Sequence, residues 1–230
     1  MEVGFISEIF FSRQGEGLFT GDSQVFVRLA GCPFRCNYCD TPDSLSANGH
    51  AAMSTELAAE KVRQLGWQHK TNAVSITGGE PLTQVDFLKE LLPLLKRDGF
   101  FIHLETAGVH HKELEMVVEW CDAIAMDIKL PSAAKDAFWV EHRRFLEAGG
   151  EKIFVKLVIE AHTKVSEVDE AIQLLAAQPK PPILIFQVVT PQGSVQAPSQ
   201  HDINGFVQSA KERLPKVLVS TQKHKEWALP

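Results

Sequence analysis

The run Ala73-Val-Ser-Ile-Thr77, followed at once by Gly78-Gly-Glu-Pro81, sets the architecture expected of this chain. Five small or β-branched residues in a row predict a buried strand. The two glycines and the proline end that strand in a turn and fix a carboxylate beside it. The same pattern, a short apolar run that ends in a polar cluster, recurs on both sides of this stretch.

Apolar runs alternate with amphipathic segments along most of the chain. The runs predict strands at Val25–Ala30, Ala73–Thr77, Phe101–Glu105, Ala123–Asp127, Ile153–Glu160, Ile183–Val188 and Val217–Ser220. The segments predict helices at Ser54–Leu65, Asp86–Arg97, Lys112–Trp120, Ala133–Ala148, Glu167–Ala177 and Asp202–Arg213. Gly66 is expected to close the first helix, and Pro93 to kink or split the second.

Strand–helix alternation of this kind predicts an α/β fold, with a mostly parallel sheet and right-handed crossovers. The strands are too few for a closed eight-fold barrel. We therefore expect an open, partial TIM-like barrel with helices outside, formed by residues 1–230 as a single domain.

Polar signatures follow four of the predicted strands at the point where each ends. They are Gly78-Gly-Glu-Pro81, Glu105-Thr-Ala-Gly108, Asp127-Ile-Lys129 and Gln187-Val-Val-Thr190. Because ligands bind at the carboxyl ends of parallel strands, these segments are expected to ring one site.

Composition limits the class of protein without naming a function. The chain has 230 residues, 44% of them hydrophobic and 23% charged, with a net charge of −6. Because charges of both signs are interspersed, the sequence shows no basic cluster of the kind that binds nucleic acid or an anionic membrane. No apolar run is long enough to span a bilayer, and the N-terminus lacks the features of a signal peptide. We expect a cytoplasmic protein with reduced thiols.

Three of the four cysteines lie in one short segment, Cys32-Pro-Phe-Arg-Cys36-Asn-Tyr-Cys39. Three thiolates from one loop can hold three irons of a [4Fe–4S] cluster and leave the fourth iron open to a second molecule. The alternative is a structural zinc ion, which needs a fourth ligand. Only Cys121 could supply another thiol, and a buried core position suits it better. A disulfide framework is disfavoured, because three close cysteines cannot pair off.

The other motifs also have alternatives. Gly78-Gly79 could form a plain turn, or a bare backbone that a ligand approaches closely, with Glu80 gripping an ammonium group. Glu105 could be a solvated charge or could bind a ribose diol. Asp40-Thr41 could cap the loop locally or hold Mg²⁺ against a carboxylate-bearing substrate.

Together, the C-x3-C-x2-C spacing and the Gly-Gly-Glu-Pro after the next strand resemble the radical S-adenosylmethionine superfamily. Within it, four segments resemble the 7-carboxy-7-deazaguanine synthase family, from about Ile6 to the last residue. They are Ser12-Arg-Gln-Gly-Glu-Gly17, Val25-Phe-Val-Arg28-Leu, Cys39-Asp-Thr41 and His224-Lys-Glu-Trp-Ala-Leu-Pro230. The segment Met126–Lys135 departs most, with Asp127-Ile128 where a Ser-Pro pair is usual.

The resemblance implies conversion of 6-carboxy-5,6,7,8-tetrahydropterin to 7-carboxy-7-deazaguanine with loss of ammonia, in 7-deazapurine biosynthesis such as the queuosine pathway. It also implies a [4Fe–4S] cluster, S-adenosylmethionine, Mg²⁺, a homodimer, and an electron donor such as flavodoxin or ferredoxin. The substrate is a small pterin, with no nucleic acid and no membrane involved. Radical chemistry would come from the cofactors, which the protein positions.

Site residues follow from the same resemblance. Cys32, Cys36 and Cys39 on the cluster loop 31–45 hold the iron, Thr41 holds Mg²⁺, and Arg28 pairs with the substrate carboxylate; these five are the expected catalytic set. Cofactor contacts are expected from Gly78, Gly79, Glu80, Glu105, Asp127, Ile128, Lys129, Gln187, Val188, Val189 and Thr190. Substrate contacts are expected from Arg13, Gln14, Gly15, Glu16, Thr77 and the free carboxylate of Pro230, on a tail 221–230 that closes the site.

Two other functions share part of this pattern. A glycyl-radical activating enzyme has the same cysteine spacing but acts on a protein chain, and has no use for the Asp-Thr pair or a fixed C-terminal proline. A cluster-bearing electron carrier or redox sensor would normally give its cluster a fourth protein ligand. It would also not need Gly-Gly-Glu-Pro.

Overall fold

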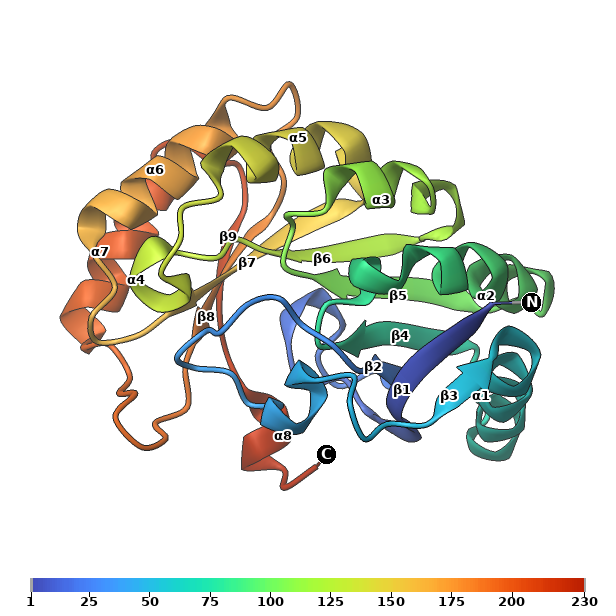
Figure 1. Cartoon of the computed structure of the whole chain (residues 1–230). Helices are drawn as coiled ribbons and strands as arrows, with labels where there is room; N and C mark the ends of the chain where they lie inside the picture. The colour runs from blue at the N-terminus through green and yellow to red at the C-terminus, as the bar shows by residue number, and fades with distance from the viewer. Residues whose placement is uncertain (1, 230) are drawn as a thin grey trace.

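A nine-stranded sheet runs through the computed structural model, which describes residues 2–229, in the strand order β3-β1-β2-β4-β5-β6-β7-β8-β9. From β2 to β9 every neighbouring pair is parallel. The sheet curves but does not close, since β3 and β9 stay at its two edges (Figure 1). The α/β fold with an open parallel barrel is therefore confirmed.

All seven predicted strands are present and end within one or two residues of their expected limits. They are β2 (Ser23–Leu29), β4 (Ala73–Gly78), β5 (Phe101–Thr106), β6 (Ala123–Asp127), β7 (Ile153–Ile159), β8 (Leu184–Val188) and β9 (Val217–Thr221). Six of these strands, β2 and β4 to β8, are largely buried, which is why their sequence signal was strong. The edge strand β9 is half-buried to exposed along its length.

The sequence analysis missed two N-terminal strands. β1 (Val3–Arg13) is antiparallel to β2, and β3 (Ala52–Ser54) is antiparallel to β1. β1 is half-buried without clean alternation, and its register with β2 shifts between Ile6 and Glu8. Its pairing depends on β2 more than on any local pattern.

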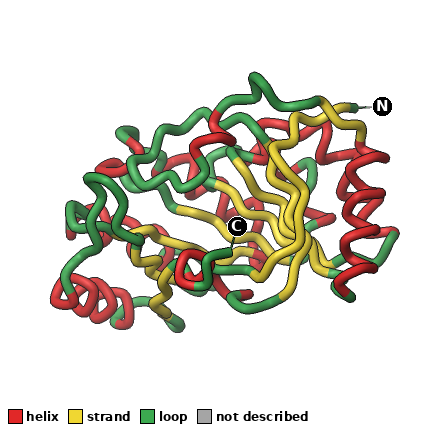
Figure 2. Tube along the Cα trace, turned by 90° about the horizontal axis from the view of Figure 1, so that it is seen from below, coloured by secondary structure: helices red, strands yellow, loops and turns green. Residues whose placement is uncertain are grey.

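Eight helices are assigned among the described residues, and the longer ones cover the outer, convex side of the sheet (Figure 1). They are α1 (Thr55–His69), α2 (Val85–Arg97), α3 (His111–Glu115), α4 (Pro131–Ala134), α5 (Trp139–Gly149), α6 (Val165–Ala176), α7 (Gln200–Lys211) and α8 (Lys223–Glu226). The last of these, α8, lies on the inner side, close to the chain before β2 (Figure 2).

One helix boundary was wrong for an identifiable reason. α1 continues through Gly66 to His69 and is capped by Lys70, whose φ is 55°. A Cβ at position 66 would lie 2.8 Å from the Phe100 ring, so this glycine serves packing instead of termination. α2 is not split at Pro93, because one stripe of buried leucines holds it against the sheet. A kink at Pro93 stays a prediction.

Two predicted helices are broken into shorter pieces. Lys112–Trp120 becomes α3 and a 3₁₀ turn at Val118–Trp120. Ala133–Ala148 becomes α4 and α5, because Lys135 adopts a left-handed conformation with a φ of 70° that ends α4.

The main core fills the space between the sheet and its outer helices. A second, small cluster lies on the inner face, where Phe154 and Ile185 pack with Phe19. Phe19 comes from the loop after β1 and stands edge-on to His103 and Phe154. These side chains fill the inside of the curved sheet below the strand ends, so open space remains at the carboxyl edge.

None of the helices in residues 2–229 combines the length and the apolar character that crossing a bilayer requires.

Leu91→Ala should lower the free energy of unfolding by about 2–5 kcal/mol, because Leu91 in α2 is fully buried and its removal leaves a cavity. Chemical denaturation of the wild type and the variant measures the difference. Leu57→Ala, on an exposed site of α1, is the matched control and should cost less than about 1 kcal/mol. Equal losses in the two variants would contradict the core described above.

Candidate active site

A cavity of about 660 Å³ lies at the carboxyl ends of the parallel strands. Its size suits a small-molecule ligand. Walls come from the loop after β1, the cysteine loop, the ends of β4 to β7 and the C-terminal tail. Sixteen of the predicted site residues line it: Arg13, Gln14, Gly15, Glu16, Arg28, Cys32, Cys36, Cys39, Thr41, Thr77, Gly78, Gly79, Glu105, Asp127, Lys129 and Val189.

The cysteine loop is fixed at both ends and in the middle. At its ends, the Gly31 and Cys32 amides donate to carbonyls of Ser44 and Leu45 at 2.8 and 3.1 Å. In the middle, the side-chain amide of Asn37 donates to Glu160 Oε1 at 2.6 Å, and the backbone N–H of Asn37 donates to the Ala133 carbonyl at 3.2 Å. The loop is thus tied to the end of β7 and to α4.

The three loop thiols are free and half-buried, and all face the cavity. Within residues 2–229 the three thiols do not all lie within 4.8 Å of one another, and none of them belongs to a set of three ligand atoms that close together. A structural zinc ion needs four ligands. Three thiols from one loop therefore fit a [4Fe–4S] cluster that has one open iron.

Burial raises the pKa of the Cys32 thiol to about 11 and also raises the pKa of Cys36. The charge of Lys129 lowers both pKa values but does not outweigh burial. A hydrogen bond from the Phe34 backbone also lowers the pKa of Cys32, and one from the Tyr38 side chain lowers that of Cys36. These thiols therefore keep their protons at neutral pH unless a metal replaces them.

Gly78 and Gly79 press against the chain that leads into the cysteine loop. The Gly79 amide donates to the Leu29 carbonyl and the Glu80 amide to the Gly31 carbonyl, both at 2.8 Å. Gly78 has a φ of 128°, and a Cβ at either glycine would overlap the backbone of Leu29 or Gly31. The bare backbone that the sequence suggested for a ligand is also required by the protein itself.

Glu80 lies behind the cavity wall, only 1% exposed. One of its oxygens accepts from Thr106 Oγ1 at 2.7 Å and from the Leu82 amide at 3.2 Å; the other accepts from the Ala107 amide at 2.7 Å. Burial raises its pKa, although these hydrogen bonds oppose the shift. Glu80 therefore braces the ends of β4 and β5, and its contact with an ammonium group stays a prediction.

Arg28 projects from β2 onto the cavity wall. Its Nε donates to Glu8 Oε1 at 2.6 Å, and its guanidinium carbon lies 5.2 Å from the centre of the Phe10 ring. Both partners come from β1, a strand that the sequence analysis missed. Together they fix the plane of the guanidinium, while its two terminal nitrogens make no hydrogen bond within the described residues.

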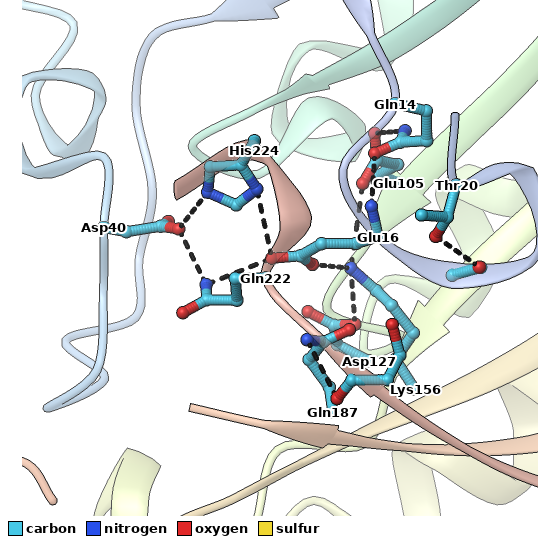
Figure 3. A network of polar contacts seen from close by, with 12 residues as sticks. Gln14, Glu16, Thr20, Asp40, Glu105, Asp127, Lys156, Gln187, Gln222 and His224 are labelled. Atoms are coloured by element: carbon cyan, nitrogen blue, oxygen red, sulfur yellow. Dashed lines mark hydrogen bonds and ion pairs between the residues drawn. The ribbon is translucent and has the colours of Figure 1, made fainter. Parts of the chain in front are cut away.

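The same cavity is lined by an acceptor group, Gln14, Glu16 and Glu105, which belongs to the network of polar contacts in Figure 3. Glu105 Oε1 accepts from Gln14 Nε2 at 3.0 Å and from Ser75 Oγ at 2.5 Å. The Gln14 Oε1 atom in turn accepts from the Glu16 amide at 3.1 Å. The structure therefore groups Glu105 with the predicted substrate residues, and its contact with a ribose stays a prediction.

Asp127 and Lys129 form an ion pair of 3.0 Å at the end of β6. The Lys129 ammonium also lies 5.5 Å from the centre of the Tyr38 ring in the cysteine loop. Burial alone would raise the pKa of Asp127, but Lys129 and Lys156 outweigh burial and lower it. The segment that departs from the family pattern thus brings fixed charges next to the cysteines.

Besides Glu80, four predicted contact residues of the described chain do not line the cavity. Ile128 is buried in the main core. Gln187 is buried and donates to the Ser220 carbonyl at 3.4 Å. Val188 is half-buried in β8, and the Thr190 amide donates to Gln222 Oε1 at 2.9 Å. Pro230 lies outside the described residues, so its predicted role is not addressed.

Several side chains at the cavity were not predicted as contacts: Glu8, Lys156, Gln222, His224 and Lys225. Asp40, which the sequence offered as a local cap or an Mg²⁺ ligand, also lines the cavity. Gln222 Nε2 donates to Asp40 Oδ2 at 3.0 Å and to Glu16 Oε1 at 3.1 Å (Figure 3). His224 Nε2 lies 3.4 Å from Asp40 Oδ2, and His224 Nδ1 lies 3.9 Å from Glu16 Oε1. A lysine in the middle of the apolar run Ile153–Ile159 was a signal that could have identified Lys156.

Thr41 also lines the cavity, and its hydroxyl makes no hydrogen bond within residues 2–229. A free hydroxyl beside an aspartate fits a hard cation such as Mg²⁺. Burial would raise the pKa of Asp40, but its hydrogen bond with His224 and the nearby Lys225 lower it to about 2. The Asp40 carboxylate is therefore charged at neutral pH.

Comparisons with known proteins agree with this geometry. Residues 27–169 match the radical SAM superfamily. The chain is 37% identical over 207 residues to a 7-carboxy-7-deazaguanine synthase of Geobacter sulfurreducens, covering 82% of each. The chain belongs to the 7-carboxy-7-deazaguanine synthase family.

Solved structures place the fold in the same family. QueE from Escherichia coli superposes with a TM-score of 0.67 at 25% identity, over 96% of this chain and 95% of that one. A radical SAM methyltransferase from Sphaerobacter thermophilus gives a TM-score of 0.66 at 14% identity, over 86% of this chain and 66% of that one, and supports the fold alone. Family membership displaces the alternatives of an activating enzyme and an electron carrier.

Cys36→Ala should abolish the cluster and all turnover, because a [4Fe–4S] cluster with an open iron already has its minimum of three thiolates. Iron content and absorbance after anaerobic reconstitution measure the loss. Cys121→Ala is the matched control: Cys121 is buried on the far side of the sheet from the loop, donates to the Val117 carbonyl, and should retain full cluster. Retained cluster and turnover in Cys36→Ala would refute the assignment.

Proposed function

We propose that this chain converts 6-carboxy-5,6,7,8-tetrahydropterin to 7-carboxy-7-deazaguanine with loss of ammonia. One observation carries the proposal: a single cavity is lined by the three thiols of the cysteine loop, the guanidinium of Arg28 and the carboxylates of Glu16 and Glu105. A pterin carboxylate has an acid group at one end and a ring edge rich in N–H donors at the other. The cavity offers a partner to each.

We assign the substrate carboxylate to Arg28. A planar guanidinium pairs with a carboxylate through two parallel hydrogen bonds. This assignment is supported by the Glu8 bond and the Phe10 ring, which orient the group and leave its terminal nitrogens free. Arg13 and Thr77 line the same cavity and would complete that end.

The N–H edge of the pterin ring is assigned to the acceptor group, Gln14, Glu16 and Glu105. An ionised carboxylate has about four lone-pair sites, so the side chains of Glu16 and Glu105 can each accept a further hydrogen bond from a ligand. Support comes from the pKa of Glu105: burial alone would raise it, but Lys156 and the bonds from Ser75 and Gln14 lower it. Glu105 is thus charged and acceptor-only at neutral pH.

Cys32, Cys36 and Cys39 would hold a [4Fe–4S] cluster, and the Gly78-Gly79 backbone, which lines the same cavity, would contact S-adenosylmethionine. When bound, this pair supplies a 5′-deoxyadenosyl radical that removes a hydrogen atom from the substrate. The residues around it orient the two molecules and exclude water. Phe34 lines the cavity and packs edge-on to Phe138 at 5.3 Å, which helps to shield the reacting groups.

Further features are proposed on the resemblance. They are Mg²⁺ at Thr41, a homodimer, a flavodoxin or ferredoxin as the electron donor, a single domain closed by tail 221–230, and a cytoplasmic location. Four unpaired cysteines suit a reducing compartment.

The proposed reaction is tested on reconstituted protein, reduced with dithionite under anaerobic conditions. The mixture contains S-adenosylmethionine, Mg²⁺ and 6-carboxy-5,6,7,8-tetrahydropterin. Mass spectrometry should detect 7-carboxy-7-deazaguanine in amounts far above the cofactor consumed. Formation of 5′-deoxyadenosine without that product would overturn the substrate assignment while leaving the radical chemistry in place.

Thr41→Ala should weaken the Mg²⁺ dependence of turnover, because the hydroxyl that faces the cavity is lost. A titration of initial rate against Mg²⁺ is the measurement, and the apparent Mg²⁺ requirement should rise by about tenfold, the equivalent of one modest ligand interaction. Thr83→Ala, a threonine that does not line the cavity, is the control. If the Mg²⁺ dependence of the rate is the same in Thr41→Ala as in wild type, Thr41 is not an Mg²⁺ ligand.

A further inference from the structure

Lys156 stands at the centre of a charged network inside the curved sheet (Figure 3). It projects from the middle of β7, and its side chain is 5% exposed. Its ammonium lies 2.9 Å from Glu16 Oε2, 3.4 Å from Asp127 Oδ1 and 3.7 Å from Glu105 Oε2. Three carboxylates from three separate elements thus share one lysine.

Within residues 2–229, Lys156 is the sole lysine or arginine paired with Glu16 or with Glu105. Asp127 has a second partner in Lys129, and Glu16 has the imidazole of His224 at 3.9 Å. Glu105 has no other charged partner among the described residues. The acceptor group therefore depends on one ammonium for its charge balance.

A buried ion pair could serve stability alone, but such pairs are often no more stable than apolar residues of similar volume. The geometry here gives Lys156 a more specific consequence. The Lys156 ammonium contacts Oε2 of both glutamates. The other oxygen, Oε1, accepts from Gln14 and Ser75 in Glu105 and from Gln222 in Glu16. Each carboxylate therefore has a partner on both of its oxygens, and both residues line the cavity.

We propose that Lys156 is a positioning residue that holds the carboxylates of Glu16 and Glu105 in place as acceptors for the N–H edge of the pterin. This inference rests on the proposed function and deepens it, since it makes one lysine on β7 responsible for how the substrate ring is recognised. Lys156 acts through the two glutamates and not by touching the reacting atoms.

The charge balance gives the proposal a pH signature. Burial raises the pKa of Glu105, and Lys156 is the main group that lowers it. Without the lysine that lowering is lost, so Glu105 should take up a proton at a higher pH than in the wild type. The other charged or titratable groups around the two glutamates are His103 beside Glu105, Asp127, which shares Lys156, and Asp40 and His224, whose ligand atoms lie within 4.8 Å of a Glu16 carboxylate oxygen. A protonated glutamate no longer serves as a pure acceptor, so ligand binding should weaken at low pH and recover as pH rises.

The test compares Lys156→Met with Lys156→Arg, which keeps the charge, in the reconstituted holoenzyme. The probe is 6-carboxypterin, whose fluorescence reports its Kd, followed from about pH 6 to about pH 7.5. Lys152→Met is the matched control, because Lys152 lies just before the opposite end of β7, outside the cavity, and binds the Val118 carbonyl. Cluster content and melting temperature check the folding of each variant.

The Lys156→Met variant should bind 6-carboxypterin about tenfold more weakly than wild type at the low end of that range, with the difference shrinking as pH rises. Lys156→Arg should keep the pH dependence of wild type even if its Kd increases. If the methionine variant does not fold, Lys156→Gln replaces it with the same expectation. In a Glu16→Gln background, Lys156→Met should weaken 6-carboxypterin binding by a smaller factor, because the Glu16 charge that the lysine would have paired is already absent.

The proposal is overturned if Lys156→Met matches wild type at every pH, or if the methionine and arginine variants lose binding equally with no change in pH dependence. It also falls if wild type neither binds 6-carboxypterin nor turns over the reduced substrate. That last result appears in the wild type alone, so failure of the proposed function is distinguishable from failure of the role of Lys156.

Discussion

The cysteine loop is held against the sheet by two backbone hydrogen bonds that only glycine allows. Gly79 and Glu80 donate to carbonyls of Leu29 and Gly31, and any Cβ at position 78 or 79 would block that approach. The contact joins the end of β4 to the end of β2, immediately before Cys32. The position of the thiols relative to the strand ends, and so the whole site, depends on this contact.

Charge in a region of low dielectric is the second organising constraint. An unpaired buried charge is costly, so each cavity carboxylate must find a cation or several donors. Asp127 uses Lys129 and Lys156, Glu105 uses Lys156 with Ser75 and Gln14, and Glu80 uses amides and a hydroxyl. Lysines lower the pKa values of Asp127 and Glu105 against the effect of burial, whereas burial raises the pKa of Glu80. The low dielectric around the two ionised carboxylates strengthens their hydrogen bonds to a ligand.

Sequence reasoning succeeded where the signal is local. The parallel strands β2 and β4 to β8 are largely buried, and their sequences are mostly apolar. Sequence reasoning failed where a distant partner decides, because β1 needs β2 and Gly66 marks a packing contact with Phe100. Most predicted site residues on loops and strand ends line the cavity, but Glu80 and Thr190 do not. Ile128 lies in the core, and Gln187 donates to the neighbouring strand.

The sequence by itself determined the parallel α/β class, the thiol loop, the glycine turn after β4 and the family to which the chain belongs. Short-range spacing encodes each of these, because chain neighbours cannot separate. Only the tertiary structure decided that Arg28 is oriented by Glu8, that Glu80 lies behind the wall, and that Lys156 joins Glu16, Glu105 and Asp127. Those groups are far apart in the chain, and the crossovers of the parallel sheet bring them to one edge.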